Sequence, residues 1–219
     1  MSRIQPQTQG RLTQAERTEI SDQKMFEATV DLIVQHGTAA TSLKEVGLKA
    51  GYSRGLASHR FGNKDALFSF VLRRLGEIWL DQLTSVTTGL TGMQAVEQAV
   101  DQHYQFCVDA PAQVRTFYTL WFEAVNTSTQ LSRAIHNIHK RRHADVVSWI
   151  ISDPKIPESA KLNADEIAEQ FCASVVGIVY AWLANPNDLD LVRRLHRGLN
   201  RTMTLRLTDL VPSKFVPSD

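Results

Sequence analysis

The sequence predicts an all-α fold with a small N-terminal head and a larger helical body. Apolar residues recur at intervals of three and four along most of the chain, which is the spacing of one helix face. Glycine, proline and asparagine interrupt these runs at intervals that suit helices and short loops. The 219 residues are 43% hydrophobic, which is enough to build a buried core in one large domain or two modest ones.

The first expected element is a helix that follows a short polar tail. Residues 1–12 are polar and rich in glutamine, so we expect a flexible tail there. Thr13 and Glu16 have the spacing of a capping box, and Ser21 is a second candidate helix start. The apolar stripe of this helix is expected to end at Gly37.

Two short helices joined by a tight turn are predicted next. Ser42 with Glu45 forms a second capping box, and Gly51 suits the left-handed conformation at a helix C-terminus. Ser53 is then expected to cap a second helix over residues 54–60. The spacing is that of a helix-turn-helix.

A helix-turn-helix inserts the N-terminal part of its second helix into the DNA major groove. Arg54 and Arg60 could each make two hydrogen bonds to a guanine edge or a phosphate, and Gly55 would let the helix approach closely. On the two helices alone, packing against other helices is an equally good interpretation. The candidate DNA-binding residues are Thr41, Ser42, Ser53, Arg54, Gly55, Ser58, His59, Arg60 and Lys64.

The stretch TSLKEVGLKAGYSRGLASHRFGNKDALF, from Thr41 to Phe68, resembles the N-terminal region of the TetR family of transcriptional regulators. The family usually has a small branched residue in place of Tyr52, and often a tyrosine in place of Ser58. The positions that match the family pattern are Thr41, Ala50, Gly51, Ser53, Gly55, His59, Phe61, Lys64 and Leu67.

The resemblance implies a domain organisation and a set of partners. The expected domains are a flexible tail over 1–12, a TetR-type helix-turn-helix DNA-binding domain over 13–75, and a helical effector-binding and dimerisation domain over 76–219. The implied partners are a near-palindromic double-stranded DNA operator, a second copy of the chain as a homodimer, and a small-molecule effector.

The body is predicted to contain six further helices. The first follows Asn63 and connects the head to the body. The expected ranges are from Asn63 to about Leu83, Met93 to Val108, Ala112 to Ala124, Thr127 or Ser128 to about Ile151, Asn163 to Ala184, and Asp188 to Thr208. Asp153, Pro154 and Pro157 are expected in a loop.

Aromatic residues concentrate in the middle of the body. Residue by residue, the core of a helical bundle is the better interpretation, but the family resemblance favours an apolar effector pocket with a few polar groups. The candidate pocket residues are His103, Phe106, Phe117, Tyr118, Trp121, Phe122 and Trp149.

The last two helices bear more apolar surface than a monomer needs to bury. Two such helices could pair with their two-fold mates in a four-helix bundle, the dimer that the resemblance implies; the alternative is that both are only core. The candidate dimer-interface residues are Phe171, Val175, Ile178, Trp182, Leu191, Leu195 and Leu199.

No metal, cofactor or catalytic site is expected. His136, His139 and His143 share a helix face, but basic residues between them oppose cation binding. Cys107 and Cys172 are too far apart for a zinc motif and are expected to be reduced, buried thiols. No nucleophile elbow or phosphate-binding glycine loop is present, so the chain is not expected to be an enzyme.

Nothing in the sequence predicts export or a membrane partner, so a cytoplasmic location is expected. The N-terminus lacks the apolar run of a signal peptide. The uncharged stretch from Phe171 is apolar only as far as Ala184, which is shorter than the ~20 residues of a membrane span. It is expected to be a buried helix.

Charge is distributed unevenly. Residues 1–75 carry 11 Lys and Arg against 7 Asp and Glu, and the remainder carries 13 against 16. A basic head suits a polyanion such as DNA. The sequence is interpreted as that of a sequence-specific transcriptional regulator, and we expect a repressor that a small-molecule effector releases from its operator. The alternative is a ligand-sensing or partner-binding dimer that does not bind DNA productively.

Overall fold

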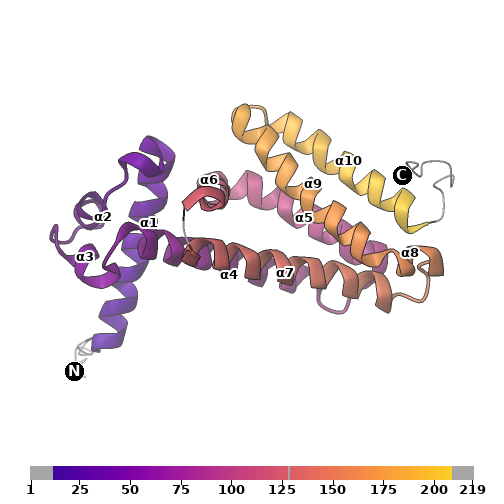
Figure 1. The fold of residues 1–219 in the computed structure, drawn as a ribbon, viewed down its shortest axis with the longest axis horizontal. Coiled ribbons are helices and arrows are strands. Elements are labelled where there is room, and N and C mark those ends of the chain that lie inside the picture. Colours follow the sequence, from indigo (N-terminus) through magenta and orange to yellow (C-terminus); the bar gives the residue numbers. More distant parts are fainter. Residues whose placement is uncertain (1–11, 128, 209–219) are drawn as a thin grey trace, which may run out of the picture. The chain divides into compact units, whose positions relative to one another are not determined.

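The computed structural model describes residues 12–127 and 129–208 (Figure 1). In this part of the chain every regular element is a helix, which confirms the predicted all-α class. The helices are α1 (Gln14–Ala40), α2 (Leu43–Lys49), α3 (Leu56–Phe61), α4 (Lys64–Thr87), α5 (Gly92–Asp109), α6 (Pro111–Thr127), α7 (Thr129–Ser152), α8 (Glu158–Leu162), α9 (Ala164–Ala184) and α10 (Leu189–Leu207). Residues 1–11 of the expected tail, and Ser128, lie outside the described residues.

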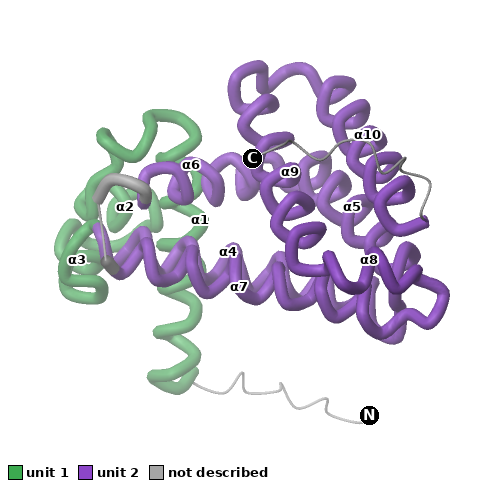
Figure 2. Tube along the Cα trace, turned by 45° about the vertical axis from the view of Figure 1, so that its right-hand side comes forward, with its two compact units in different colours: residues 1–64 green, residues 65–219 purple. Residues whose placement is uncertain are grey.

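The chain divides into two compact units, residues 1–64 and residues 65–219 (Figure 2). The division lies within the first turn of α4, eleven residues before the predicted domain boundary at residue 75. The extent of the DNA-binding domain therefore stays a prediction. The two units are described separately below.

The N-terminal unit begins with the predicted capping box. The Thr13 backbone donates to the Glu16 carboxylate, with 2.7 Å between the nitrogen and the oxygen, and the Glu16 N–H bonds the Thr13 hydroxyl. Gly37, with φ 77° and ψ 172°, breaks the regular path of α1 where the sequence predicts its end. The face of α1 around Met25, Phe26 and Ile33 is buried.

The second helix of the predicted helix-turn-helix is shorter than expected. The helix α3 begins at Leu56 rather than at Arg54, and its N-cap is Gly55, which has no side-chain cap. Ser53 therefore does not cap α3 with its hydroxyl. Instead its backbone carbonyl accepts a hydrogen bond from the Leu56 N–H, so Arg54 lies in the turn before the helix.

The C-terminal unit is a bundle of helices that pack against one another around a shared core. The helix α5 packs on α10, α7 packs on α9, and α9 packs on α10. The additional short helix α8 begins after Pro157, where the sequence predicts only a loop. Proline tolerates this position because the first N–H groups of a helix have no partner within it.

Helix α9 is long and apolar enough, by length and composition alone, to cross a membrane. Among the described residues it is the one helix that meets this criterion. It nevertheless packs in the bundle, and Phe171, Val175 and Trp182 on its inner face are all at most 6% exposed. This agrees with the expected buried helix, although the helix is longer than its uncharged core.

Candidate functional site

The turn between α2 and α3 is held by backbone contacts. Gly51 has a φ of 81°, which a glycine adopts without strain, and the Tyr52 N–H donates to the Gly47 carbonyl over 2.9 Å. A Cβ atom added to Gly47 would lie 2.7 Å from the carbonyl oxygen of Ser53. Gly47 is therefore needed for the close approach of the turn to α2, which sets the direction of α3.

Five of the predicted DNA-binding residues lie on the exposed surface of this turn and of α3. Space around Gly55 is open, because no atom lies within 4 Å of a Cβ added there. The arrangement gives one guanidinium, two hydroxyls and an imidazole, all able to hydrogen-bond a polyanion. These five residues are Ser53, Arg54, Gly55, Ser58 and His59; Arg60 is exposed as well, but it forms an ion pair with Asp22.

Arg60 has a structural partner that sequence reasoning missed. Its Nε and Nη2 atoms bond the two carboxylate oxygens of Asp22 over 2.8 and 2.6 Å, joining α3 to α1. The hydrogen bond and charge of Asp22 raise the pKa of Arg60. The Asp22 side chain is only 10% exposed, whereas that of Arg60 is 46% exposed, so the pair joins α3 to α1 and a DNA contact by Arg60 stays a prediction.

Thr41 is buried, with 1% exposure, and its hydroxyl donates to the Gly37 carbonyl over 2.8 Å. Its predicted DNA contact is therefore wrong for the side chain. Ser42 instead caps α2 through the predicted box with Glu45. The Lys64 ammonium donates to the Ala39 carbonyl over 3.1 Å. These residues support the helices rather than lying free on the surface.

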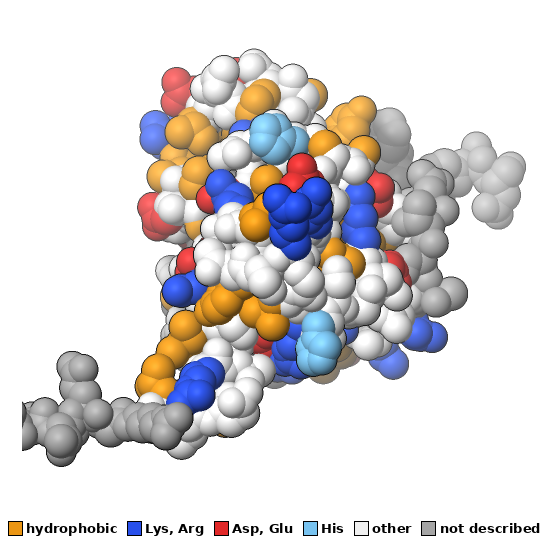
Figure 3. All heavy atoms as spheres, turned by 90° about the vertical axis from the view of Figure 1, so that its left-hand side faces the viewer, with side chains coloured by type: hydrophobic (Ala, Val, Ile, Leu, Met, Phe, Trp, Pro, Cys, Tyr) orange, Lys and Arg blue, Asp and Glu red, His pale blue; other side chains and the backbone are white. Residues whose placement is uncertain are grey.

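Basic side chains on the face drawn in Figure 3 form separate groups with hydrophobic and acidic side chains between them. Two lysines of the N-terminal unit belong to local pairs that the sequence does not reveal. The Lys24 ammonium lies 5.6 Å from the centre of the Tyr52 ring, and Lys49 lies 3.4 Å from Asp31. The positive charge on this face is therefore divided among separate groups.

In the C-terminal unit, four predicted pocket residues surround one small cavity. Its walls include Trp79 of α4, which is not among the predicted pocket residues. The rings of Trp79 and His103 pack edge to face with their centroids 5.1 Å apart, and the rings of Trp79 and Phe106 stack with their centroids 5.5 Å apart. The cavity holds about 10 Å³, the space of one water, so a larger molecule would need these helices to separate. The lining residues are Trp79, His103, Phe106, Phe117 and Tyr118.

The other three predicted pocket residues lie elsewhere, so the seven do not line a single pocket. Trp121 borders a separate open groove of about 460 Å³ on α6 and α7, together with His136 and His139. Phe122 meets the ring of Tyr180 at 6.1 Å, and Trp149 is half-buried on α7 and lines neither space. Helical periodicity could not separate these faces, because it does not show which neighbouring helix covers each apolar position.

A buried chain of hydrogen bonds runs from the cavity wall to α10. His103 Nδ1 lies 2.8 Å from His196 Nε2, and His196 Nδ1 lies 2.7 Å from the Val192 carbonyl oxygen. The carbonyl only accepts, so a neutral His196 carries its proton on Nδ1 and accepts at Nε2. His103 then donates from Nδ1, and its Nε2 accepts from the Tyr118 hydroxyl at 3.3 Å. Burial lowers the pKa of both histidines, which favours this neutral arrangement.

Arg142 is a second buried polar residue that sequence reasoning missed. It is 5% exposed, and its guanidinium hydrogen-bonds the Tyr118 side chain. Burial raises the pKa of Tyr118, and the charge of Arg142 opposes that rise. The surface that lines the cavity is therefore apolar, and the permanently charged Arg142 lies behind Tyr118.

The predicted dimer-interface residues are largely used within the single chain, which corrects their assignment. Five of them are 1–6% exposed, and Leu191 and Leu195 are half-buried. The inner faces of α9 and α10 cover each other and their neighbours, because one apolar stripe per helix suffices for a bundle core. The five buried residues are Phe171, Val175, Ile178, Trp182 and Leu199.

Comparisons with known proteins agree with the arrangement of the N-terminal unit. The profile of the family described as bacterial regulatory proteins, tetR family, matches residues 26–70. An HTH-type transcriptional repressor of Mycobacterium tuberculosis is 32% identical over 79 residues, which make up 36% of this chain. The matched part of this chain spans 40% of the length of that repressor.

Solved structures resemble the whole fold. A transcriptional regulator from Rhodococcus sp. Rha1 has a TM-score of 0.75 and 24% identity, covering 88% of this chain and 100% of its own. A complex of SmeT with triclosan has a TM-score of 0.67 and 20% identity, covering 91% and 96%. SmeT is the repressor of the Stenotrophomonas maltophilia multidrug efflux pump SmeDEF. The N-terminal region of this chain therefore resembles the TetR family, and the chain shares an all-helical fold with these solved regulators.

Proposed function

We propose that the chain is a sequence-specific DNA-binding transcriptional regulator that acts as a cytoplasmic homodimer. The observation that carries the proposal is the surface of the turn and of α3. There Arg54, Ser58 and His59 are exposed on a helix-turn-helix whose direction Gly47 sets. The matched relatives are transcriptional regulators, in keeping with the expectation that the chain is not an enzyme.

A two-fold dimer would present two α3 helices to successive major grooves, about 34–36 Å apart, and read a near-palindromic operator. The dimer surface we propose is the outer face of α9, in place of the buried face predicted from sequence. Ala173, Ser174 and Gly177 are exposed there and allow close approach, and Tyr180 is 66% exposed. Gly177→Arg should yield monomers in sedimentation, whereas Gln94→Arg on the outer face of α5 should not.

Control by a small molecule is the second part of the proposal. The aromatic cavity between α4, α5 and α6 would open around an effector and favour a state with weaker operator affinity. A coupling free energy of about 1–3 kcal/mol would suffice to regulate. SmeT, which has the same fold, is known in complex with triclosan. Repression is the proposed outcome, because a bound dimer would block polymerase.

The test is a binding titration with labelled DNA from the chain's own upstream region and with scrambled DNA, at two salt concentrations. Tight binding to the first and weaker, salt-sensitive binding to the second would support the proposal. Arg54→Ala should remove the preference while leaving sedimentation unchanged. If Arg54→Ala binds as well as the unmodified protein, this surface is not the DNA reader. If neither DNA is bound, a ligand-sensing dimer without productive DNA binding replaces the proposal.

A further inference from the structure

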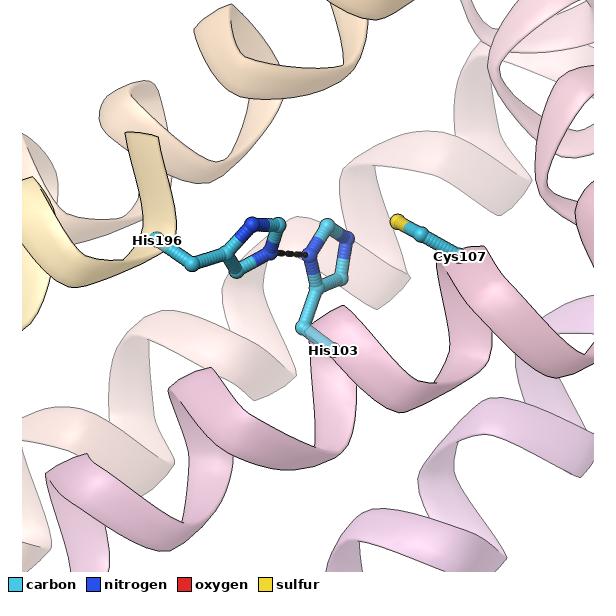
Figure 4. A group of neighbouring side chains, drawn as sticks. All are labelled: His103, Cys107 and His196. Atoms are coloured by element: carbon cyan, nitrogen blue, oxygen red, sulfur yellow. Dashed lines mark hydrogen bonds between the residues drawn. The ribbon is translucent and has the colours of Figure 1, made fainter. Parts of the chain in front are cut away.

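A cluster of three potential metal ligands lies in the core of the C-terminal unit. It consists of His103 and Cys107 on α5 and His196 on α10 (Figure 4). One ligand atom from each residue lies within 4.8 Å of the other two, and all three side chains are buried. His103 and Cys107 are four residues apart, so they share one face of α5 and point toward the same neighbour.

We propose that this cluster binds a monovalent soft metal ion, Cu⁺, through two imidazoles and one thiolate. Thiolate ligands favour Cu⁺ and Zn²⁺ over harder cations, and imidazole suits both. The proposal goes beyond DNA binding, and its test does not depend on DNA.

The movements that binding requires differ between the three ligands. With about 2.0 Å to a nitrogen and about 2.3 Å to a sulfur, three ligands around one ion lie roughly 3.4–3.8 Å apart. The two histidine nitrogens, now 2.8 Å apart, would separate by less than ~1 Å. Figure 4 shows the Cys107 sulfur on the other side of the His103 ring from His196, so the Cys107 side chain would turn around the edge of that ring to reach the ion.

The hydrogen bonds already orient one ligand. His196 donates from Nδ1 to the Val192 carbonyl, which leaves its Nε2 lone pair directed at the cluster. A backbone carbonyl in this position is a common support for a metal-bound histidine. On binding, the His103 proton moves from Nδ1 to Nε2, where it is donated to the Tyr118 oxygen. His103 Nδ1 then becomes the second ligand.

Charge selects the ion. Cys107 must lose its proton to bind, so one proton is released for each ion bound. Thiolate with Cu⁺ is neutral, whereas thiolate with Zn²⁺ leaves a positive charge. The permanently charged Arg142 guanidinium is buried nearby and already acts on His103. A second buried positive charge would be costly, so the monovalent ion fits better. The apolar wall formed by Trp79 and Phe106 also suits an ion that takes few ligands.

The experiment is an anaerobic titration of the purified full chain with Cu⁺ against a coloured Cu⁺ chelator, with a parallel titration of Zn²⁺. One Cu⁺ per chain is expected, with X-ray absorption showing one sulfur and two nitrogen neighbours. Cys107→Ser and His196→Gln should each weaken binding about 100-fold or more. Cys172→Ser is the matched control, since Cys172 is also a buried thiol but lies outside the cluster, and it should bind normally.

Three results would overturn the proposal. They are no Cu⁺ binding by the unmodified chain, unchanged binding by Cys107→Ser, and tight binding of Zn²⁺ in preference to Cu⁺. Circular dichroism melting of each variant distinguishes loss of a ligand from loss of the fold. The absorption spectrum of the unmodified chain tests the ligand set even if a variant does not fold.

Discussion

The two units place their chemistry in opposite environments. In the N-terminal unit the groups proposed to act, such as Arg54 and His59, are exposed, and the buried polar contacts serve the fold. In the C-terminal unit the polar groups proposed to act, such as His103 and Arg142, are themselves buried. An exposed DNA-binding residue can therefore be substituted without a loss of stability. A substitution in the buried polar cluster of the C-terminal unit also affects the packing of its core.

The largest change in stability is expected at Gly47, where helix α2 packs closely against the backbone of the following turn. Gly47→Ala should lower the free energy of unfolding by about 2–3 kcal/mol, because the added Cβ would lie 2.7 Å from the Ser53 carbonyl oxygen. Gly55→Ala is the control, with open space around the added atom, and should be nearly neutral for stability. Urea denaturation measures both. Equal stability of the two variants would refute the close packing of the turn.

The next effect separates a structural arginine from a surface one. Arg60→Ala should cost about 2 kcal/mol of stability, because it leaves the nearly buried Asp22 carboxylate without its charged partner. Arg54→Ala should change stability by less than about 0.5 kcal/mol while weakening specific DNA binding by about 1–3 kcal/mol. Thermal denaturation and DNA titration of both proteins would check this. Equal destabilisation by the two changes would contradict the division of roles.

In the C-terminal unit, a single buried hydroxyl should matter for stability. Tyr118→Phe should cost about 1 kcal/mol, because His103 and Arg142 each lose a hydrogen-bond partner in the core. Tyr104→Phe is the matched control. Its hydroxyl accepts a hydrogen bond from Arg193 over 3.0 Å at the surface, so its loss should cost less than about 0.5 kcal/mol. A larger loss for Tyr104→Phe would show that the buried network contributes little.

The smallest effect is a pH dependence at the start of α2. Hydrogen bonds from Ser42 lower the pKa of Glu45 below its ordinary 4.5. The capping stabilisation is therefore complete above about pH 4.5 and is lost as the pH falls through the lower pKa of the folded state. The free energy of unfolding, measured by denaturation at pH values between 6 and 3, should fall less steeply with pH for Glu45→Gln than for the unmodified chain. Identical slopes would show that the box does not depend on the charge of Glu45.

The local features were predictable because each depends on residues close together in the chain. The capping boxes of Thr13 and Ser42 were confirmed, as was the break at Gly37. The start of α3 was not predictable, because Ser53 uses its backbone rather than its hydroxyl to form the turn. The position of a serine in the sequence does not show whether its hydroxyl or its backbone carbonyl will accept the hydrogen bond at the start of a helix.

The sequence by itself therefore determined the all-helical class, the helix-turn-helix and the residues that lie exposed on its turn. Only the tertiary structure decided which apolar face of α9 is core, that Arg60 pairs with Asp22, 38 residues away, and that His196 meets His103, 93 residues away. Helical periodicity reports that a face is apolar but not what covers it. A pair of side chains on different helices is set by the packing of those helices, which no local pattern encodes.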